Sequence, residues 1–213
     1  MNLSFPKIYP ILDGSFIPAN ARAEFLRGLG EALADAGVTL LEYRNKTGSD
    51  AELLADGAVL RAALPSGKIK LILDDRIDLV EELGFDGVHV DAGDATPAEA
   101  RQLLGSERIV GTFGGSASLV AGILAEPADY LAVGPVCRTT TKKTATPPIG
   151  IEGIRRLREE AGAGPVLVAA GGVTLATAAL VLQAGADSVA VSEALFGHPN
   201  PAAEFRKWVA ELG

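Results

Sequence analysis

The chain has 213 residues, of which 48% are hydrophobic, and its formal net charge at pH 7 is -8. This charge argues against nucleic acid as a partner, and the single cysteine, Cys137, excludes an intrachain disulfide framework. No signal-peptide pattern or membrane-length apolar run is present, so we expect a cytoplasmic protein with no membrane partner.

Eight short apolar runs, spread over the whole chain, are the predicted β-strands. Each is rich in Val, Ile and Leu without a clear alternation, which is typical of parallel strands buried on both faces. In chain order they are residues 7–13, 39–44, 68–75, 87–91, 108–113, 129–136, 164–172 and 187–195.

The segments between these strands have helical composition and helix stop signals. Residues 21–37 and 151–162 are rich in Ala, Leu, Glu and Arg and end at glycine. Residues 96–105 combine a threonine N-cap, a proline in the first turn, a capping-box glutamate and a final glycine. Strands and helices that alternate eight times predict a (β/α)8 TIM barrel, a single domain over residues 1–213; a doubly wound open sheet is the alternative.

Two cationic residues follow the second predicted strand. Arg44 and Lys46 are two positions apart, so their side chains leave the strand on the same side. In a barrel this edge of every strand lies on the face where ligands bind. A planar guanidinium beside a compact ammonium predicts a clamp for an anion, and a salt-bridged strand end is the alternative.

Carboxylates follow the next two predicted strands. Asp74 and Asp75 end the third strand, and Asp94 follows the fourth. Because these strands are neighbours in a barrel, their carboxylates suit a Mg²⁺ ion that also takes phosphate oxygens and water. The alternative is that these carboxylates cap helices or pair with Arg76.

The segment GPVCRTTTKKTATPPIG, residues 134–150, follows the sixth predicted strand. Its hydroxyls, lysines and glycines suit a phosphate, although a solvated loop closed by prolines has the same composition. The glycines of AAGGV after the seventh strand and Ser192 after the eighth occupy the place where barrels often bind phosphate.

Two anion regions are therefore expected. The first, for a diphosphate, combines Arg44, Lys46 and Lys142, and the second, for a monophosphate, combines Thr139, Thr141, Gly172 and Ser192. No nucleophile is paired with a base: Cys137 has no evident histidine partner, and His89 is interpreted as a hydrogen-bonded core histidine. A diphosphate clamp with a metal and no base indicates that the leaving group departs by charge neutralisation.

Six motifs in this order and spacing resemble the thiamine-phosphate synthase (thiamine-phosphate pyrophosphorylase) family over nearly the whole chain. They are LEYRNK, LILDDR, DGVHVDAGD, GPVCRTTTKKT, VAAGGV and GADSVAVSEALF. The resemblance implies that 4-amino-2-methyl-5-hydroxymethylpyrimidine diphosphate is joined to 4-methyl-5-hydroxyethylthiazole phosphate. Diphosphate leaves, the pyrimidine stabilises a carbocation, and the thiazole nitrogen captures it.

The resemblance also implies roles for particular residues. Arg44 and Lys46 would bind the diphosphate, Lys142 would neutralise its departing charge, and Asp75 and Asp94 would hold Mg²⁺. The thiazole phosphate pocket would be lined by Thr139, Thr140, Thr141, Gly172, Ser192 and Glu193. The implied partners are phosphorylated small molecules, and a homodimer is compatible with the family.

The chain departs from the family pattern in the substrate-binding positions. The family usually has Gln at Glu42, Asn at Asp74 and Ser at Phe113, and it has Val-Ser where this chain has Ser192 and Glu193. After the fourth strand a family Gly-Gln-x-Asp is here DAGD, residues 91–94. The alternatives are therefore a related barrel with altered chemistry, such as a thiazole tautomerase, or a non-catalytic protein that binds thiamine precursors.

Overall fold

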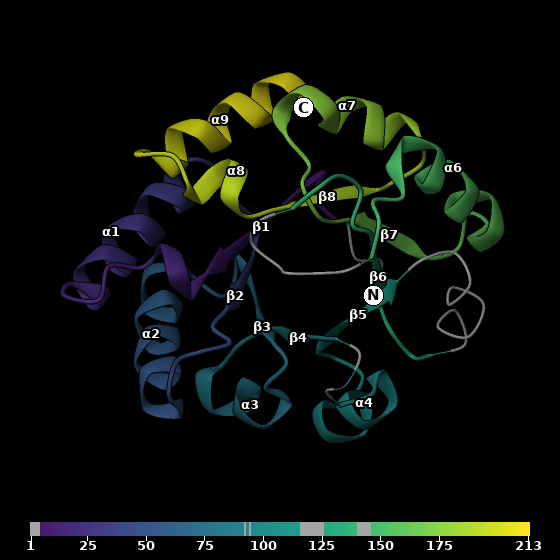
Figure 1. Cartoon of the computed structure of the whole chain (residues 1–213). Helices are drawn as coiled ribbons and strands as arrows, with labels where there is room; N and C mark the ends of the chain where they lie inside the picture. The colour runs from purple at the N-terminus through teal and green to yellow at the C-terminus, as the bar shows by residue number, and fades with distance from the viewer. Residues whose placement is uncertain (1–4, 92, 94, 116–125, 140–145) are drawn as a thin grey trace.

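The structure is a computed structural model that describes residues 5–91, 93, 95–115, 126–139 and 146–213. Eight parallel strands form a closed barrel in chain order, and β8 pairs with β1 (Figure 1). The strands are β1 (Ile8–Asp13), β2 (Leu40–Arg44), β3 (Lys70–Asp74), β4 (Gly87–Val90), β5 (Ile109–Gly115), β6 (Tyr130–Val133), β7 (Val166–Ala169) and β8 (Ser188–Val191). The predicted (β/α)8 barrel is confirmed, and the open sheet is wrong.

The helices form a ring outside the strands (Figure 1). They are α1 (Arg22–Asp35), α2 (Asp50–Ala63), α3 (Val80–Leu83), α4 (Pro97–Leu104), α6 (Gly150–Ala161), α7 (Leu175–Gln183), α8 (Glu193–Phe196) and α9 (Pro201–Leu212), with 3-10 turns η1 (Gly14–Phe16) and η2 (Ile77–Leu79). The interval between β5 and β6 includes residues 116–125, which lie outside the described residues.

The predicted capping box of α4 is confirmed. The Glu99 backbone N–H donates to Thr96 Oγ1 at 3.2 Å, and the Thr96 N–H donates to Glu99 Oε2 at 2.8 Å. These two bonds satisfy donors that the first turn of a helix cannot pair internally. The sequence therefore fixes where this helix begins.

Three strands end three or four residues earlier than predicted, because the apolar runs continue into turns. β7 stops at Ala169, and the following Gly171 and Gly172 have φ values of +88° and +68°. This left-handed backbone favours glycine and cannot extend a strand. β6 stops before Gly134, and β8 stops at Val191, so that Glu193 already begins α8.

The interior of the barrel is filled at the amino-terminal ends of the strands. The rings of Phe5, Tyr9 and Tyr130 contact one another, with centroids 4.9 to 5.7 Å apart. Tyr130 fits only because residue 111 is glycine, since a Cβ on Gly111 would lie 2.0 Å from the tyrosine ring. The filled end leaves space only toward the carboxyl ends of the strands.

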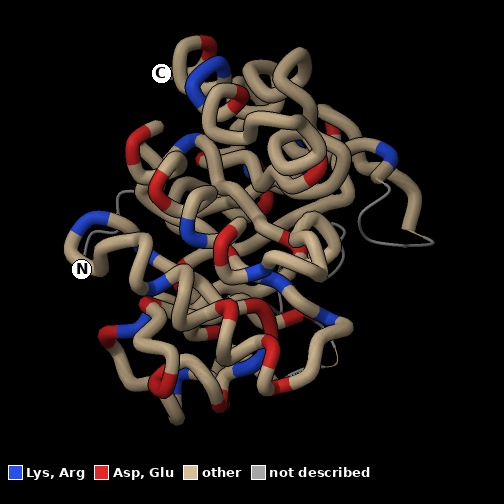
Figure 2. The backbone as a smooth tube through the Cα atoms, turned by 90° about the vertical axis from the view of Figure 1, so that its left-hand side faces the viewer, with Lys and Arg blue, Asp and Glu red and all other residues tan. Residues whose placement is uncertain are grey.

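Helix α9 closes the ring of helices. It packs against α1, α7 and α8, and its Trp208 is 1% exposed. Figure 1 shows it beside α1, so that the last and first helices meet. Acidic and basic residues are interspersed along the backbone in the view of Figure 2. Among the described residues, none of the helices has both the length and the apolar character needed to cross a membrane.

Candidate active site

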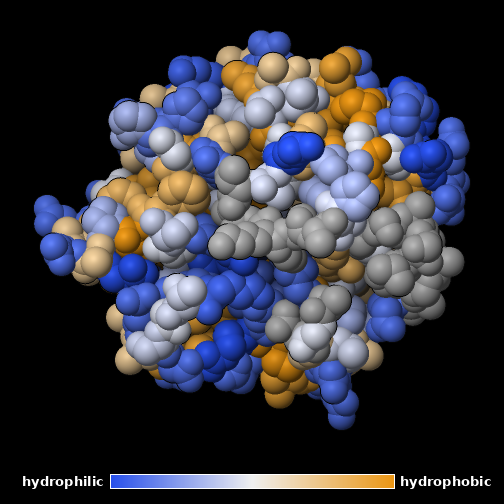
Figure 3. All heavy atoms as spheres, in the orientation of Figure 1, coloured by the Kyte–Doolittle hydropathy of each residue, from blue (hydrophilic) through white to orange (hydrophobic). Residues whose placement is uncertain are grey.

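A cavity of about 550 Å³ opens at the carboxyl ends of the strands, and every strand of the barrel contributes to its wall. This is the face on which (β/α)8 barrels place their ligands. In Figure 3 hydrophilic residues gather in the middle of the face that is turned toward the viewer. The deeper walls carry apolar side chains, among them Ile11, Phe113, Ala132 and Val168.

A chain of hydrogen bonds crosses the floor of the cavity. The Tyr9 hydroxyl donates to Glu42 Oε2 at 2.7 Å, and the hydroxyl oxygens of Tyr9 and Tyr130 are 2.8 Å apart. His89 Nδ1 lies 3.1 Å from the Tyr130 hydroxyl. The prediction that His89 is a buried, hydrogen-bonded histidine is confirmed, but the ring also lines the cavity, which was not predicted.

Glu42 is 2% exposed and lies at the inner end of this chain. Burial raises the pKa of its carboxyl to about 8, and the charge of Asp74 adds to the increase. Desolvation disfavours the charged form of a carboxyl, and a nearby like charge does the same. At neutral pH this group therefore keeps its proton and can both donate and accept a hydrogen bond.

The two predicted cationic residues lie side by side at the end of β2. Arg44 Nη1 contacts Asp13 Oδ2, and Arg44 Nε is 3.4 Å from Asp74 Oδ2. Lys46 Nζ is 3.3 Å from the same Asp74 oxygen and also contacts Asp75 Oδ2. The structure thus shows the salt-bridged strand end that was the alternative interpretation, and the anion clamp stays a prediction.

Three carboxylates can converge on one point beside these cations. Asp74, Asp75 and Asp91 each offer an oxygen, and these oxygens all lie within 4.8 Å of one another. Asp74 and Asp75 were predicted to lie here. Asp91 was expected at a strand end but not as a metal ligand, and Asp94, a predicted ligand, lies outside the described residues. Arg76 pairs with Asp50 and Asp78 instead, so the alternative in which it neutralises Asp74 and Asp75 is wrong.

The donor set fits a hard divalent cation. Among the described residues, Asp74 Oδ2 is buried and accepts no hydrogen bond, and it forms ion pairs with Arg44 and Lys46. Burial and the charge of Asp75 raise the pKa of Asp74 to about 7, although Lys46 and Arg44 act in the opposite direction. Carboxylate oxygens at this density are suitable ligands for Mg²⁺ or a similar ion.

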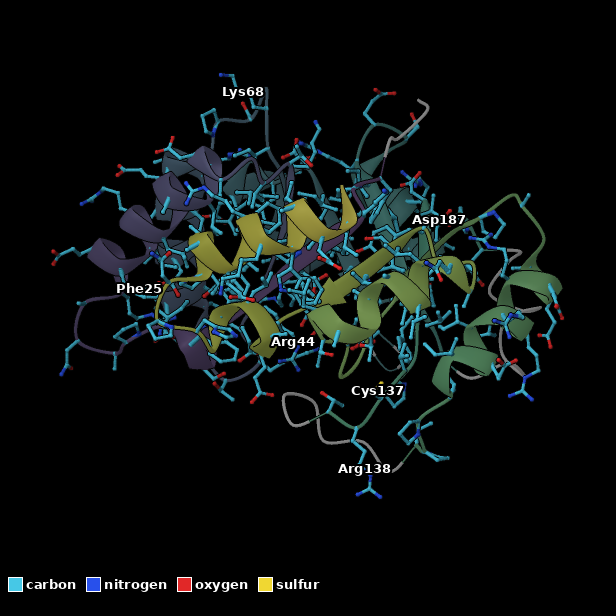
Figure 4. All side chains as sticks on the ribbon, turned by 90° about the horizontal axis from the view of Figure 1, so that it is seen from above. Phe25, Arg44, Lys68, Cys137, Arg138 and Asp187 are labelled. Carbon is cyan, nitrogen blue, oxygen red and sulfur yellow. The ribbon has the colours of Figure 1, made fainter. Side chains whose placement is uncertain are left out.

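The loop after β6 runs beside the turn after β7. The Val136 N–H donates to the Ala170 carbonyl and the Cys137 N–H to the Gly171 carbonyl, both at 2.9 Å. A Cβ on Gly172 would lie 2.2 Å from the Arg138 carbonyl oxygen, so the approach of the two segments requires glycine there. Arg138 extends from this loop away from the barrel (Figure 4).

Four residues of the predicted monophosphate region line the cavity together: Thr139, Gly172, Ser192 and Glu193. Ser192 Oγ is buried and has no hydrogen-bond partner among the described residues. A buried hydroxyl without a partner is costly unless a ligand or water pairs with it. Thr140, Thr141 and Lys142, which were predicted for the same loop, lie outside the described residues.

The sequence-based prediction missed the residues that build the floor, Tyr9 and Tyr130. Asp13 was expected at the end of the first strand, but its contact with Arg44 was not predicted. Asp13 is 8% exposed and accepts hydrogen bonds from the Ser15 N–H at 3.0 Å and from Ser15 Oγ at 2.6 Å. Alternation within β1 was the available signal, because residues 9, 11 and 13 share one face of a strand.

The fold and the cavity define the class of protein, which is a (β/α)8 barrel with charged groups gathered at the carboxyl ends of its strands. The model of the thiamine monophosphate synthase family matches residues 8–195. The thiamine-phosphate synthase of Koribacter versatilis (strain Ellin345) is 38% identical over 95% of this chain and 95% of its own. That of Chloroflexus aurantiacus is 33% identical over 94% of this chain and 90% of its own.

A solved structure agrees with these sequence matches. The thiamine phosphate pyrophosphorylase from Pyrococcus furiosus superposes with a TM-score of 0.80 and 28% identity, over 97% of this chain and 96% of that one. The chain belongs to the thiamine monophosphate synthase family.

Proposed function

We propose that this chain is a thiamine-phosphate synthase, which joins the pyrimidine diphosphate to the thiazole phosphate and releases diphosphate. Family membership over residues 8–195 supports the activity. The observation that carries the site assignment is the arrangement at one cavity mouth of two cations, Arg44 and Lys46, beside the acidic group of Asp74, Asp75 and Asp91. A diphosphate carried by a divalent cation matches both sets of charges.

The reaction balances without a protein base. The bond between the pyrimidine methylene carbon and the diphosphate oxygen breaks, and the electron pair leaves with the diphosphate. The thiazole nitrogen then donates its lone pair to the methylene carbon, so the new C–N bond forms without a proton transfer. Arg44 and Lys46 bind and orient the leaving group, and Lys142 would stabilise the charge that develops on it.

A Mg²⁺ ion held by Asp75 together with Asp94, Asp74 or Asp91 would supply further neutralisation of the leaving diphosphate. The monophosphate of the thiazole partner would bind at Thr139, Gly172 and Ser192, with Thr140, Thr141 and the backbone of Glu193 beside it. Phe113 would pack against the pyrimidine, where Glu42 and Asp74 also face the cavity.

The activity test is a diphosphate-release assay with purified protein, Mg²⁺ and both precursors, with one precursor omitted in each control. We expect release only when both precursors are present, with an equal amount of thiamine phosphate formed. A folded protein that binds the thiazole phosphate but releases nothing would contradict the synthase and favour the non-catalytic alternative. Localisation in the cytoplasm and assembly into a homodimer stay predictions. Light scattering on the purified protein tests the homodimer.

A further inference from the structure

The ammonium group of Lys46 contacts two of the three clustered carboxylates directly, those of Asp74 and Asp75. Its Nζ is 3.3 Å from Asp74 Oδ2 and contacts Asp75 Oδ2. These two carboxylates belong to the set of three whose oxygens lie within 4.8 Å of one another. Lys46 and a divalent cation would therefore use the same two carboxylates.

The two partners in this contact differ in their freedom to move. The Asp74 side chain is 3% exposed and lies at the end of β3, inside the barrel. The Lys46 side chain is 33% exposed and follows the last residue of β2, Arg44. Lysine carries its charge on a flexible four-carbon stem, so Lys46 can leave while Asp74 stays.

Arg44 is held in place by more contacts than a single ion pair. Its guanidinium contacts Asp13 Oδ2 with one nitrogen and is 3.4 Å from Asp74 Oδ2 with another. Asp13 is itself fixed by two hydrogen bonds from Ser15. Of the two cations in the predicted clamp, Arg44 is thus braced from both sides, and Lys46 is the more exposed, at 33% against 19%.

We infer that Lys46 and a divalent cation exclude each other from Asp74 and Asp75, so that cation binding releases the Lys46 ammonium for the anionic substrate. The inference rests on the proposed function for the identity of that substrate. The exchange itself concerns only this chain and the cation. It makes the cation a condition for a full anion clamp, because without it the Lys46 ammonium stays paired with Asp74 and Asp75.

The exchange predicts an effect of unusual sign. Lys46→Met removes a positive charge that competes with the cation, so the variant should bind the cation more tightly than the wild type, by about tenfold or more. A lysine that only supports the local structure would have no such effect, and a lysine that only helps to organise the carboxylates would have the opposite one.

The matched control is Lys70→Met. Lys70 is a 49% exposed lysine whose Nζ is 2.9 Å from Asp86 Oδ1. Its replacement changes the net charge of the protein by the same amount and also breaks a lysine–aspartate pair, but away from the cavity. Lys46→Arg is a second control, since it retains the competing charge.

The experiment is titration calorimetry of Mn²⁺ into each protein without substrate, at low ionic strength, after circular dichroism has shown that each variant is folded. We expect the dissociation constant to fall in Lys46→Met and to change less than about twofold in Lys70→Met and Lys46→Arg. If Lys46→Met does not fold, Lys46→Gln serves the same purpose.

Equal or weaker Mn²⁺ binding by the Lys46→Met variant would overturn the inference, as would the absence of Mn²⁺ binding in both the wild type and this variant. This outcome is independent of the proposed function, because no substrate is present. A wild-type protein that releases no diphosphate would instead refute the proposed function and leave the cation comparison to decide the exchange.

Discussion

The buried Glu42 side chain in the cavity should make the free energy of unfolding depend on pH. Its carboxyl is 2% exposed, it accepts a hydrogen bond from Tyr9, and it shares the cavity with Asp74. The ordinary pKa of this carboxyl is 4.5, and burial raises it to about 8 in the folded chain. Between these values the folded state binds more protons than the unfolded state, so the free energy of unfolding falls as pH rises.

The first prediction is that Glu42→Gln flattens this dependence. An amide keeps the shape and has no charge to bury, so the variant should gain stability over the wild type at pH 8 and gain much less at pH 5. Urea unfolding at both pH values measures the difference. Glu31→Gln, an exposed change in α1, is the control and should leave the slope unchanged. A wild type whose stability rises from pH 5 to pH 8 relative to Glu42→Gln would contradict the prediction.

A second prediction at this scale concerns Gly111, where an added Cβ would lie 2.0 Å from the Tyr130 ring. Gly111→Ala should destabilise the fold by about 1–3 kcal/mol, because the ring cannot move in a packed barrel. Gly28→Ala is the contrast: nothing lies within 4 Å of its Cβ position in helix α1, and alanine there should be neutral or stabilising. Urea unfolding compares the two, and equal effects would show that the Tyr130 contact does not control this position.

At the scale of elements, the turn between β2 and α2 decides where Lys46 lies. Asn45 Oδ1 accepts a hydrogen bond from the Gly48 N–H at 2.9 Å, and its Nδ2 donates to Glu52 Oε1 at 2.8 Å. Glu52 belongs to α2, whose Asp56 contacts Arg22 of α1. Asn45 thus ties the turn that carries Lys46 to the neighbouring helices.

We predict that Asn45→Ala raises the KM for the pyrimidine diphosphate by about tenfold, since the turn loses the hydrogen bonds of the Asn45 side chain and Lys46 loses its fixed position. Asn200→Ala is the matched control: it removes the cap at the start of α9, where Asn200 Oδ1 accepts from the Ala203 N–H at 3.0 Å. Steady-state kinetics of both variants test this. A KM that rises equally in both, in proportion to lost stability, would refute a specific positioning role.

The strands could be predicted from sequence, but the floor of the cavity could not. Runs such as residues 129–136 are apolar on both faces, which identifies buried parallel strands and hides which side chains point inward. The Tyr9–Tyr130 contact joins strands 121 residues apart in the chain. Charged residues at strand ends could be recognised because a polar residue after an apolar run is conspicuous. The partners of Asp13 and Asp91 could not be predicted, because they come together only in the closed barrel.

At the scale of the whole molecule, closure of the barrel makes the chain ends depend on each other. β1 pairs with β8, and α9 packs against α1 and α7. Trp208, the only tryptophan of the chain, is 1% exposed in α9. Its fluorescence therefore reports on the region where the last helix meets the first.

We predict that residues 1–213 unfold as one domain. The urea transition seen by Trp208 fluorescence should coincide with that seen by far-UV circular dichroism, because a closed barrel cannot lose one strand pair and keep the others in place. An early fluorescence transition, with most of the helical signal retained, would show that the C-terminal part separates first and would contradict the single domain.

Among the described residues, the ring cluster of Phe5, Tyr9 and Tyr130 closes one end of the barrel and the cavity opens at the other, so we expect both substrates and both products to pass through this opening. A substrate that lies against the floor cannot enter once its partner covers it. We therefore expect a compulsory order of addition, in which the precursor whose ring lies deeper binds first. Thiamine phosphate, the product that keeps this ring, should depart after diphosphate. Product-inhibition patterns distinguish this sequence from random addition.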